Sequence, residues 1–409
     1  MYRNFSFIIL FFSGFGLVYS KELANVCESY DGYFTDKNTN PECFYDPDLD
    51  ANVEQRAVNH GLLAEKHYIR TEDSWILITF RLKNLNGTYG KGVVFLQHGL
   101  GTDATSFTGN GNKSIAFFLA KQGYDVWLGN FRGTDFSSSQ NLQNKQFWDF
   151  SYHEHGLYDL PANFKYITAK TKSKIYYIGH SMGGSAIAVY FSTKPEEALT
   201  FVKYTTFLCA TTYMRHTKGL LNFNIINNLY ALLLNWIPQA VLTGLGFTNI
   251  SGLESMCFAS RENLRVCTRL NEYVAGSGVG YKMSPEKFLL AWRAIKNLGV
   301  KQMLHFAQTI HSRDFRMFDY GPRQNMIRYN SIIPPPYDLS KLPTNITLIY
   351  GANDYISTKE DTLYVFNKYG KRNWEVYEIP YNHVDHFYDY KYADKAFFPL
   401  LLKSINKHI

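Results

Sequence analysis

Three residues of this sequence, Ser181, Asp354 and His383, have the types and the order needed for acyl transfer through a serine. A serine hydroxyl is a weak nucleophile until a histidine takes its proton. An acid then holds the imidazole in the useful tautomer and stabilises its charged form. Because the three lie far apart in the chain, separate elements of the fold must bring them together.

Ser181 lies in the turn Gly179-His-Ser-Met-Gly183, after an apolar run over Ile175–Ile178 and before a helical pattern over Ser185–Phe191. Strand, G-x-S-x-G and helix form the nucleophile elbow of α/β-hydrolases. Gly179 and Gly183 leave room where strand and helix backbones pass closely. The alternative is a glycine-rich turn whose serine has no catalytic role. The presence of an acid and a histidine at suitable positions decides between the two.

Asp354 ends the turn after a predicted strand over Asn345–Tyr350, and His383 follows the last predicted strand, Trp374–Ile379. Ser, Asp and His occur in the order expected of this fold. The backbone N–H of Met182, directly after the nucleophile, is the first predicted oxyanion donor.

The second predicted donor is Leu100, because His98-Gly-Leu-Gly101 follows an apolar strand over Gly92–Gln97. His98 and His180 flank the site and are expected to shape its loops.

Rival residues occupy less suitable positions. Asp361 lies in a helical pattern, and Asp319 lies in a long insertion. His386 is close to His383, but Pro380-Tyr-Asn382 marks the tight turn directly before His383. His153-Glu-His155 resembles a metal motif; without a further ligand cluster it reads as a polar approach to a helix, and we expect no metal or cofactor.

The elements around these residues indicate an α/β protein. Strands that alternate with helices predict a mostly parallel central sheet with helices on both faces. The chain begins this pattern with a hairpin and continues it to the elbow through the following segments: strands at His67–Arg70, Trp75–Leu82 and Asp125–Leu128, and helices near Ser114–Gln122 and Tyr158–Ala169.

The alternation stops in a segment that we expect to be a largely helical cap over the site. Its Leu220–Phe247 stretch is apolar but rich in asparagine, which would be costly in lipid and favours amphipathic helices. Further helical material is predicted over Glu286–Ala307. The expected division is a signal peptide at 1–20, a first core part at 21–210, the cap at 211–342 and a second core part at 343–409.

The first twenty residues are typical of a secretory signal: Arg3, an uncharged run over Phe7–Val18, and small residues up to Ser20. An uncleaved anchor is the alternative. Export agrees with four N-glycan acceptor positions, of which the last begins a predicted strand and is the least favourable: Asn86, Asn112, Asn249 and Asn345.

Five cysteines also suit an oxidising compartment. Cys257 and Cys267 are expected to pair within the cap, Cys27 and Cys43 flank an N-terminal segment, and Cys209 is expected to be a buried free thiol. Sequence alone does not fix the pairing.

The composition limits the partners. Apolar residues make up 45% of the chain, and the net charge of +7 falls to +6 when Arg3 is removed with the signal. Because no basic stripe with interleaved aromatic residues occurs, we expect no nucleic-acid partner. After signal cleavage we expect no transmembrane segment.

Taken together, these motifs resemble the acid lipase family of animal gastric, lingual and lysosomal acid lipases and their insect relatives, over roughly residues 45 to 400. The matching stretches lie in the core and in the insertion: His98–Leu100, Gly123–Asn130, Arg132–Gly133, Phe147–Ser151, Tyr158–Ala162, Gly179–Gly183, Phe318–Gly321, Pro335–Tyr337, Gly351–Asp354 and Asn382–Asp385.

The resemblance implies hydrolysis of neutral-lipid esters, triacylglycerols or sterol esters, with Ser181 as nucleophile, Asp354 as acid and His383 as base. Met182 replaces a common glutamine, which matters little because its backbone N–H has the role. The expected location is extracellular or the gut lumen, with the lysosome as alternative. Two other functions are a lipid-binding or yolk-type protein on an inactive lipase fold, and an esterase for small esters.

Overall fold

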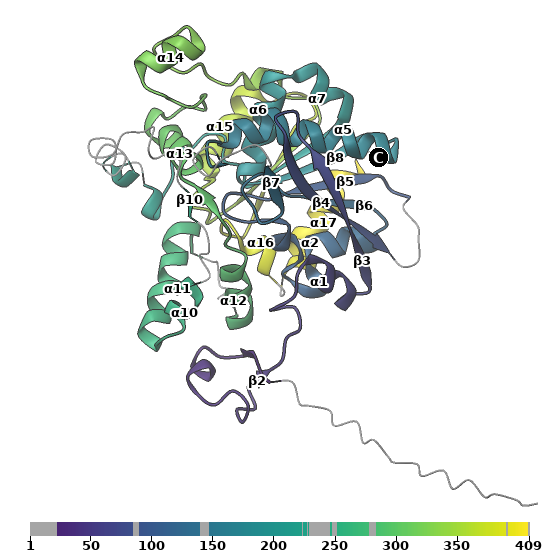
Figure 1. The fold of residues 1–409 in the computed structure, drawn as a ribbon, viewed down its shortest axis with the longest axis vertical. Helices are drawn as coiled ribbons and strands as arrows, with labels where there is room; N and C mark the ends of the chain where they lie inside the picture. Colours follow the sequence, from purple (N-terminus) through teal and green to yellow (C-terminus); the bar gives the residue numbers. More distant parts are fainter. Residues whose placement is uncertain are drawn as a thin grey trace, which may run out of the picture.

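The computed structural model describes residues 23–84, 90–139, 147–222, 224–226, 228, 246–247, 252–277, 284–389 and 392–407. At its centre is a nine-stranded sheet in the order β13-β12-β9-β8-β5-β6-β4-β3, with β7 paired to β4 (Figure 1). The strands are β3 (Leu62–Arg70), β4 (Trp75–Asn84), β5 (Val93–Gln97), β6 (Asp125–Gly129), β7 (Ser137–Ser139), β8 (Ile175–His180), β9 (Val202–Leu208), β12 (Ile346–Gly351) and β13 (Glu375–Ile379).

The sheet is parallel from β13 to β6, and antiparallel pairing begins where β6 meets β4. The predicted hairpin is the β3–β4 pair, in which Leu62 faces Asn84 and Arg70 faces Ile76. The two strands are longer than the apolar runs that predicted them. Because all parallel strands point the same way, the carboxyl ends of β5, β8, β12 and β13 meet at one edge, where the predicted site residues follow them.

Helices cover both faces of the sheet. In β5, Val94 and Leu96 pack into one core cluster, while Val93 and Phe95 pack into the other. This is the alternation that a strand requires when both of its faces are buried. On the first face lie α1 (Val53–Asn59), α2 (Ile115–Lys121), α16 (Asp385–Tyr388) and α17 (Phe398–Asn406), and on the second α5 (Leu160–Thr171), α6 (Met182–Thr193), α7 (Pro195–Phe201) and α15 (Lys359–Tyr369).

Between β9 and β12 the described chain is mainly helical, and these helices lie to one side of the sheet (Figure 1). They are α10 (Gly252–Cys257), α11 (Arg261–Ala275), α12 (Pro285–Arg293), α13 (Val300–Ser312) and α14 (Pro322–Tyr329). Most of the Leu220–Phe247 stretch is outside the described residues. Among the helices that are described, none has the length and apolar character of a membrane span.

One part of the helical prediction is wrong. The stretch Glu286–Ala307 is not one helical run, because α12 ends at Arg293 and α13 begins at Val300. Between them, β11 (Leu298–Gly299) pairs antiparallel with β10 (Gly246–Phe247). Residues in a strand pair cannot also make helical hydrogen bonds, so the helix is interrupted.

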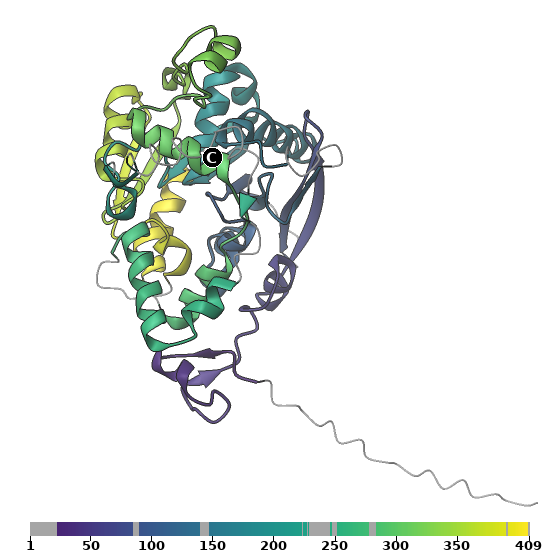
Figure 2. The same cartoon turned by 60° about the vertical axis from the view of Figure 1, so that its left-hand side comes forward.

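The N-terminal extension packs against the cap. Strands β1 (Val26–Cys27) and β2 (Cys43–Phe44) are joined by a Cys27–Cys43 disulfide, and this hairpin lies below α11 and α12 in Figure 2. The Tyr30 ring meets Phe288 of α12 edge to face at 6.0 Å. A second disulfide, Cys257–Cys267, joins α10 to α11, and Cys209 is a buried free cysteine.

Candidate active site

Ser181, His383 and Asp354 form one continuous chain of hydrogen bonds at the carboxyl edge of the sheet. The Ser181 Oγ lies 2.9 Å from His383 Nε2, and His383 Nδ1 lies 2.8 Å from Asp354 Oδ2. The other carboxylate oxygen, Oδ1, accepts from the backbone N–H groups of Ile356 and Ser357, each at 2.8 Å. This arrangement suits proton transfer from the hydroxyl to an imidazole whose tautomer is fixed by the acid.

The backbone at Ser181 has the strained geometry of a nucleophile elbow. Its φ of 51° is in the left-handed region, which non-glycine residues seldom adopt. A Cβ on Gly179 would lie 2.8 Å from the Gly183 oxygen, and a Cβ on Gly183 would lie 2.7 Å from the Gln97 oxygen. Both glycines are therefore required for β8, α6 and the end of β5 to pack so closely.

The rival residues have other partners. The Asp361 carboxylate accepts one hydrogen bond from His216 Nδ1 at 2.8 Å and a second from the backbone N–H of His216 at 3.0 Å. The Asp319 carboxylate accepts from Gly321 and Asn325 in the cap. His386 is buried against the rings of its neighbours rather than hydrogen-bonded to Ser181. The hydrogen-bond chain therefore joins Asp354 and His383, the residues that follow predicted strands, to Ser181. The rival residues take no part in it.

The loop after β5 lies directly against the nucleophile, since a Cβ on Gly99 would be 2.9 Å from the Ser181 Cβ. This contact places the neighbouring Leu100 backbone beside the elbow. Met182 occupies the first position of α6, where backbone N–H groups have no partner within the helix. The backbone N–H groups of Leu100 and Met182 are the oxyanion donors that the sequence predicts beside the nucleophile.

His98 and His180 shape the two loops, as expected. His98 Nδ1 donates to the Gly99 oxygen at 2.8 Å, and its Nε2 accepts from Phe131 N–H at 3.0 Å. Burial lowers the pKa of His98 to about 3, which agrees with a neutral ring that donates on one side and accepts on the other. His180 Nε2 donates to the His383 backbone oxygen at 3.0 Å, and burial holds its pKa well below the ordinary value.

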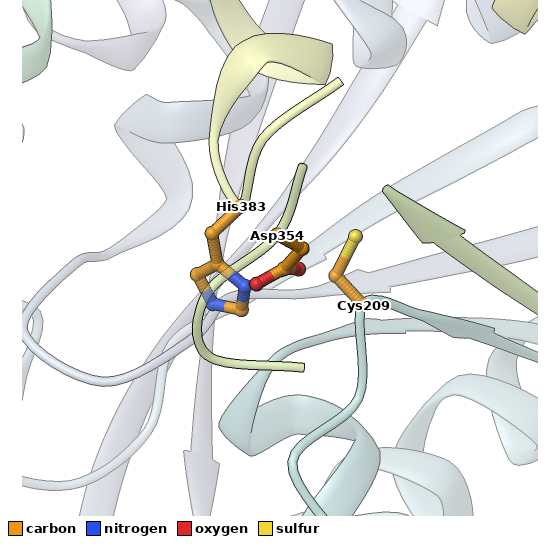
Figure 3. A group of neighbouring side chains, drawn as sticks. All are labelled: Cys209, Asp354 and His383. Carbon is orange, nitrogen blue, oxygen red and sulfur yellow. The ribbon is translucent and has the colours of Figure 1, made fainter. Parts of the chain in front are cut away.

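Cys209 lies behind the acid. Figure 3 shows the Asp354 side chain between the His383 ring and the Cys209 thiol. One ligand-type atom from each residue lies within 4.8 Å of the others, a spacing that a metal ion could bridge. His383 Nδ1 is already paired with Asp354, however, and the thiol lies beside the same carboxylate. Burial, followed by the Asp354 charge, raises the pKa of the thiol well above its ordinary value, so the thiol stays protonated.

The metal-like pair, His153 and His155, is used for structure. His155 Nδ1 is 3.0 Å from the buried Asp159 carboxylate, which also holds Arg132. His153 pairs with the Tyr337 hydroxyl at 2.8 Å. These bonds tie the segment before α5 to Arg132, which follows β6, and to the cap, which agrees with the polar helix approach read from the sequence.

Two of the predicted glycan positions fall in the described chain. Asn112 is exposed in a short turn before α2. Asn345 is half-buried at the start of β12, where its side chain accepts from Asn373 and its backbone oxygen accepts from Thr205. Asn86, Asn249 and the predicted signal at 1–20 lie outside the described residues.

Sequence reasoning missed the contacts that the cap makes with the site. Gln302 of α13 donates to Met182 Sδ at 3.7 Å and also contacts His155 Nε2 at 2.9 Å. The Lys296 N–H donates to the Gly101 oxygen in the loop after β5 at 2.7 Å. No sequence spacing predicts such contacts, because they join segments that are distant in the chain.

Comparisons with known proteins agree with the fold. The profile of the α/β hydrolase fold family matches residues 92–390, and that of a partial α/β-hydrolase lipase region matches residues 53–111.

Among similar proteins, "Lipase member K" of Mus musculus is 32% identical over 93% of this chain and 95% of its own length. "Gastric triacylglycerol lipase" of Bos taurus is 33% identical over 83% of this chain and 87% of its own. "Lysosomal acid lipase/cholesteryl ester hydrolase" of Homo sapiens is 29% identical over 77% of this chain and 81% of its own.

Among solved structures, the one titled "The structure of DcsB complex with its substrate analogue" has a TM-score of 0.52 at 13% identity. It covers 85% of this chain and 99% of that chain, and shows a shared fold.

Proposed function

Because the chain belongs to the acid lipase family of the α/β-hydrolases, we propose that it cleaves fatty-acyl esters of neutral lipids through an acyl-enzyme on Ser181. The chain is a carboxylic ester hydrolase of the lipase type. The single observation that carries the assignment of residues is the unbroken hydrogen-bond chain from Ser181 through His383 to Asp354.

The proposed reaction begins when His383 Nε2 takes the proton of Ser181 Oγ as the oxygen attacks the ester carbonyl. The backbone N–H groups of Leu100 and Met182 stabilise the negative oxygen of the tetrahedral intermediate. His383 then gives the proton to the leaving alkoxide, and Asp354 stabilises the imidazolium throughout. Water, activated by the same imidazole, attacks the acyl-serine and releases the fatty acid.

The proposed substrates are triacylglycerols, sterol esters or both, presented at a lipid–water interface. Names of relatives support this class, since they include a gastric triacylglycerol lipase and a lysosomal acid lipase/cholesteryl ester hydrolase. We further propose secretion with cleavage after Ser20, glycosylation of exposed acceptor asparagines such as Asn112, and a location outside the cell or in the lysosome.

The experiment that tests the substrate class is a panel of esters at acid and neutral pH. It should include an emulsified triacylglycerol, an emulsified sterol ester and a water-soluble short-chain ester, with Ser181→Ala as the control. A lipase should show a sharp rise in rate once a sparingly soluble ester exceeds its solubility and forms an emulsion. A rate that saturates below the solubility limit, with no turnover of emulsions, would instead identify an esterase for small esters.

A further inference from the structure

The end of α11 touches both of the loops that carry the acid and the base. The Ala275 carbonyl accepts the backbone N–H of His383 at 3.1 Å and that of Tyr355 at 3.4 Å. The next carbonyl, Gly276, accepts the side-chain N–H of Asn382 at 3.2 Å. One helix end in the cap therefore binds the base itself and the residues adjacent to the acid and to the base.

These contacts allow little displacement. Gly276 has a φ of 106°, and a Cβ there would lie 1.8 Å from the Asn353 oxygen, next to the acid. On the other side, a Cβ on Gly219 would lie 1.9 Å from the Tyr273 oxygen in the last turn of α11. The helix end is thus packed between the acid loop and residues that follow β9.

The start of α11 is also fixed. The Cys257–Cys267 disulfide joins it to α10. Arg261, at its first position, pairs with Asp31 of the N-terminal extension at 3.3 Å. Beneath the helix, Leu264 and Phe288 are buried together with the disulfide and pack against aromatic rings of that extension. In the views of Figures 1 and 2, α11 runs from the N-terminal hairpin towards the carboxyl edge of the sheet.

We propose that α11 is a fixed strut of the cap, whose C-terminal carbonyls position Asp354 and His383 for reaction with Ser181. This inference rests on the proposed function, because it concerns the same triad. Ala275 and Gly276 are positioning residues, since they touch the backbone of the catalytic loops and not the substrate. The described part of the cap then contributes to the chemistry itself, in addition to any control of access by lipid.

The test uses the full-length protein and a water-soluble ester, whose hydrolysis does not depend on contact with an emulsion. In Gly276→Ala the new methyl group displaces the helix end from the acid loop, and Gly219→Ala displaces it from the opposite side. Displacements of about 1 Å in a catalytic group cost roughly a hundredfold in rate. We expect both variants to lower kcat on the soluble ester by about that factor with little change in KM.

The matched control is Gly321→Ala, which is also in the cap and also has a positive φ, of 83°, but has open space where its Cβ would lie. It incurs the same kind of backbone strain without pressing on a catalytic loop, so its kcat should stay near wild type. Titration of reactive serine with a phosphonate ester corrects each kcat for unfolded protein. If Gly276→Ala does not fold, Gly219→Ala decides the question.

The inference is overturned if Gly276→Ala or Gly219→Ala keeps its kcat on the soluble ester and loses only the hydrolysis of emulsions. That result would identify α11 as part of an access lid alone. Failure of the proposed function looks different: Ser181→Ala would then retain wild-type hydrolysis of every ester, whatever the glycine variants do.

Discussion

At the scale of single residues, Ser181, His383 and Asp354 are linked by consecutive hydrogen bonds, so they act as one unit. Ser181→Ala and His383→Ala should each lower kcat by roughly a millionfold, and the double variant should be hardly worse. Asp354→Asn should cost less, about ten-thousandfold, because serine and histidine remain but the imidazole is poorly oriented. Steady-state kinetics on a soluble ester measure all four.

His386→Ala is the control for these variants. The ring is buried beside His180 but makes no hydrogen bond to Ser181 or Asp354, so turnover should stay within about tenfold of wild type. If His386→Ala abolished turnover and His383→Ala spared it, the base would have been assigned to the wrong histidine. Wild-type activity in Ser181→Ala would reject the nucleophile.

At the scale of elements, the sequence predicted the strands that carry the site, because their apolar runs end in turns rich in glycine, proline and asparagine. Asp354 and His383 were placed correctly relative to β12 and β13 for this reason. The break between α12 and α13 was not predicted. Leu298 pairs with Phe247 in a short strand pair, and that partner is distant in the sequence. The proximity of Cys209 to Asp354 was also missed, because it depends on two strand ends that meet only in the folded sheet.

Helix α16, directly after the turn that carries His383, begins with a second buried carboxyl group, Asp385, whose Oδ2 accepts from the Asn382 N–H at 2.9 Å. Burial raises the pKa of Asp385 to about 6, and the Asp389 and Asp354 charges act in the same direction. In an unfolded chain an aspartate titrates near 3.9. Between these values the folded protein holds a proton that the unfolded chain has released, so this group stabilises the fold below about pH 4 and loses that contribution as pH rises to about 6.

The expected contribution of Asp385 over this window is roughly 3 kcal/mol, from about two pH units at 1.36 kcal/mol each. Asp385→Asn keeps an acceptor for the Asn382 N–H and removes the titration. Urea unfolding at a series of pH values from acid to neutral should show a steeper decline in the free energy of unfolding for wild type than for Asp385→Asn. Equal slopes for the two proteins would contradict the role given to this carboxyl group.

At the scale of the whole molecule, the proposed export makes a prediction about the mature chain. If the first twenty residues are removed after Ser20, N-terminal sequencing of secreted protein should begin at Lys21. Exposed Asn112 should carry a glycan, so glycosidase treatment should lower the mass, and Asn112→Gln should remove part of that change. Asn345→Gln is the matched comparison and should change the mass little, because that side chain is half-buried at the start of β12. A secreted protein that retains Met1 would contradict the cleavage.

The protein as a whole is tied together by contacts that cross its sequence order. The N-terminal extension packs on the cap, and the cap in turn holds the loops after β5, β12 and β13. Such contacts could not be predicted from the sequence. Tyr30 and Phe288 are distant in the chain, and the residues around each give no indication of the other.

The odd number of cysteines has a consequence for how this chain acquires its disulfides. Four cysteines can pair in three ways, and a fifth adds a choice of which thiol is left out. Both native bonds close short loops, with sequence separations of 16 and 10, so their closure costs less entropy than any pairing with Cys209. In the folded sheet the raised pKa of Cys209 leaves almost no thiolate to attack either bond. Disulfide exchange through Cys209 is therefore expected only in the unfolded chain. Once β9 has paired with its neighbours in the sheet, the thiol that follows it is buried and no longer reacts.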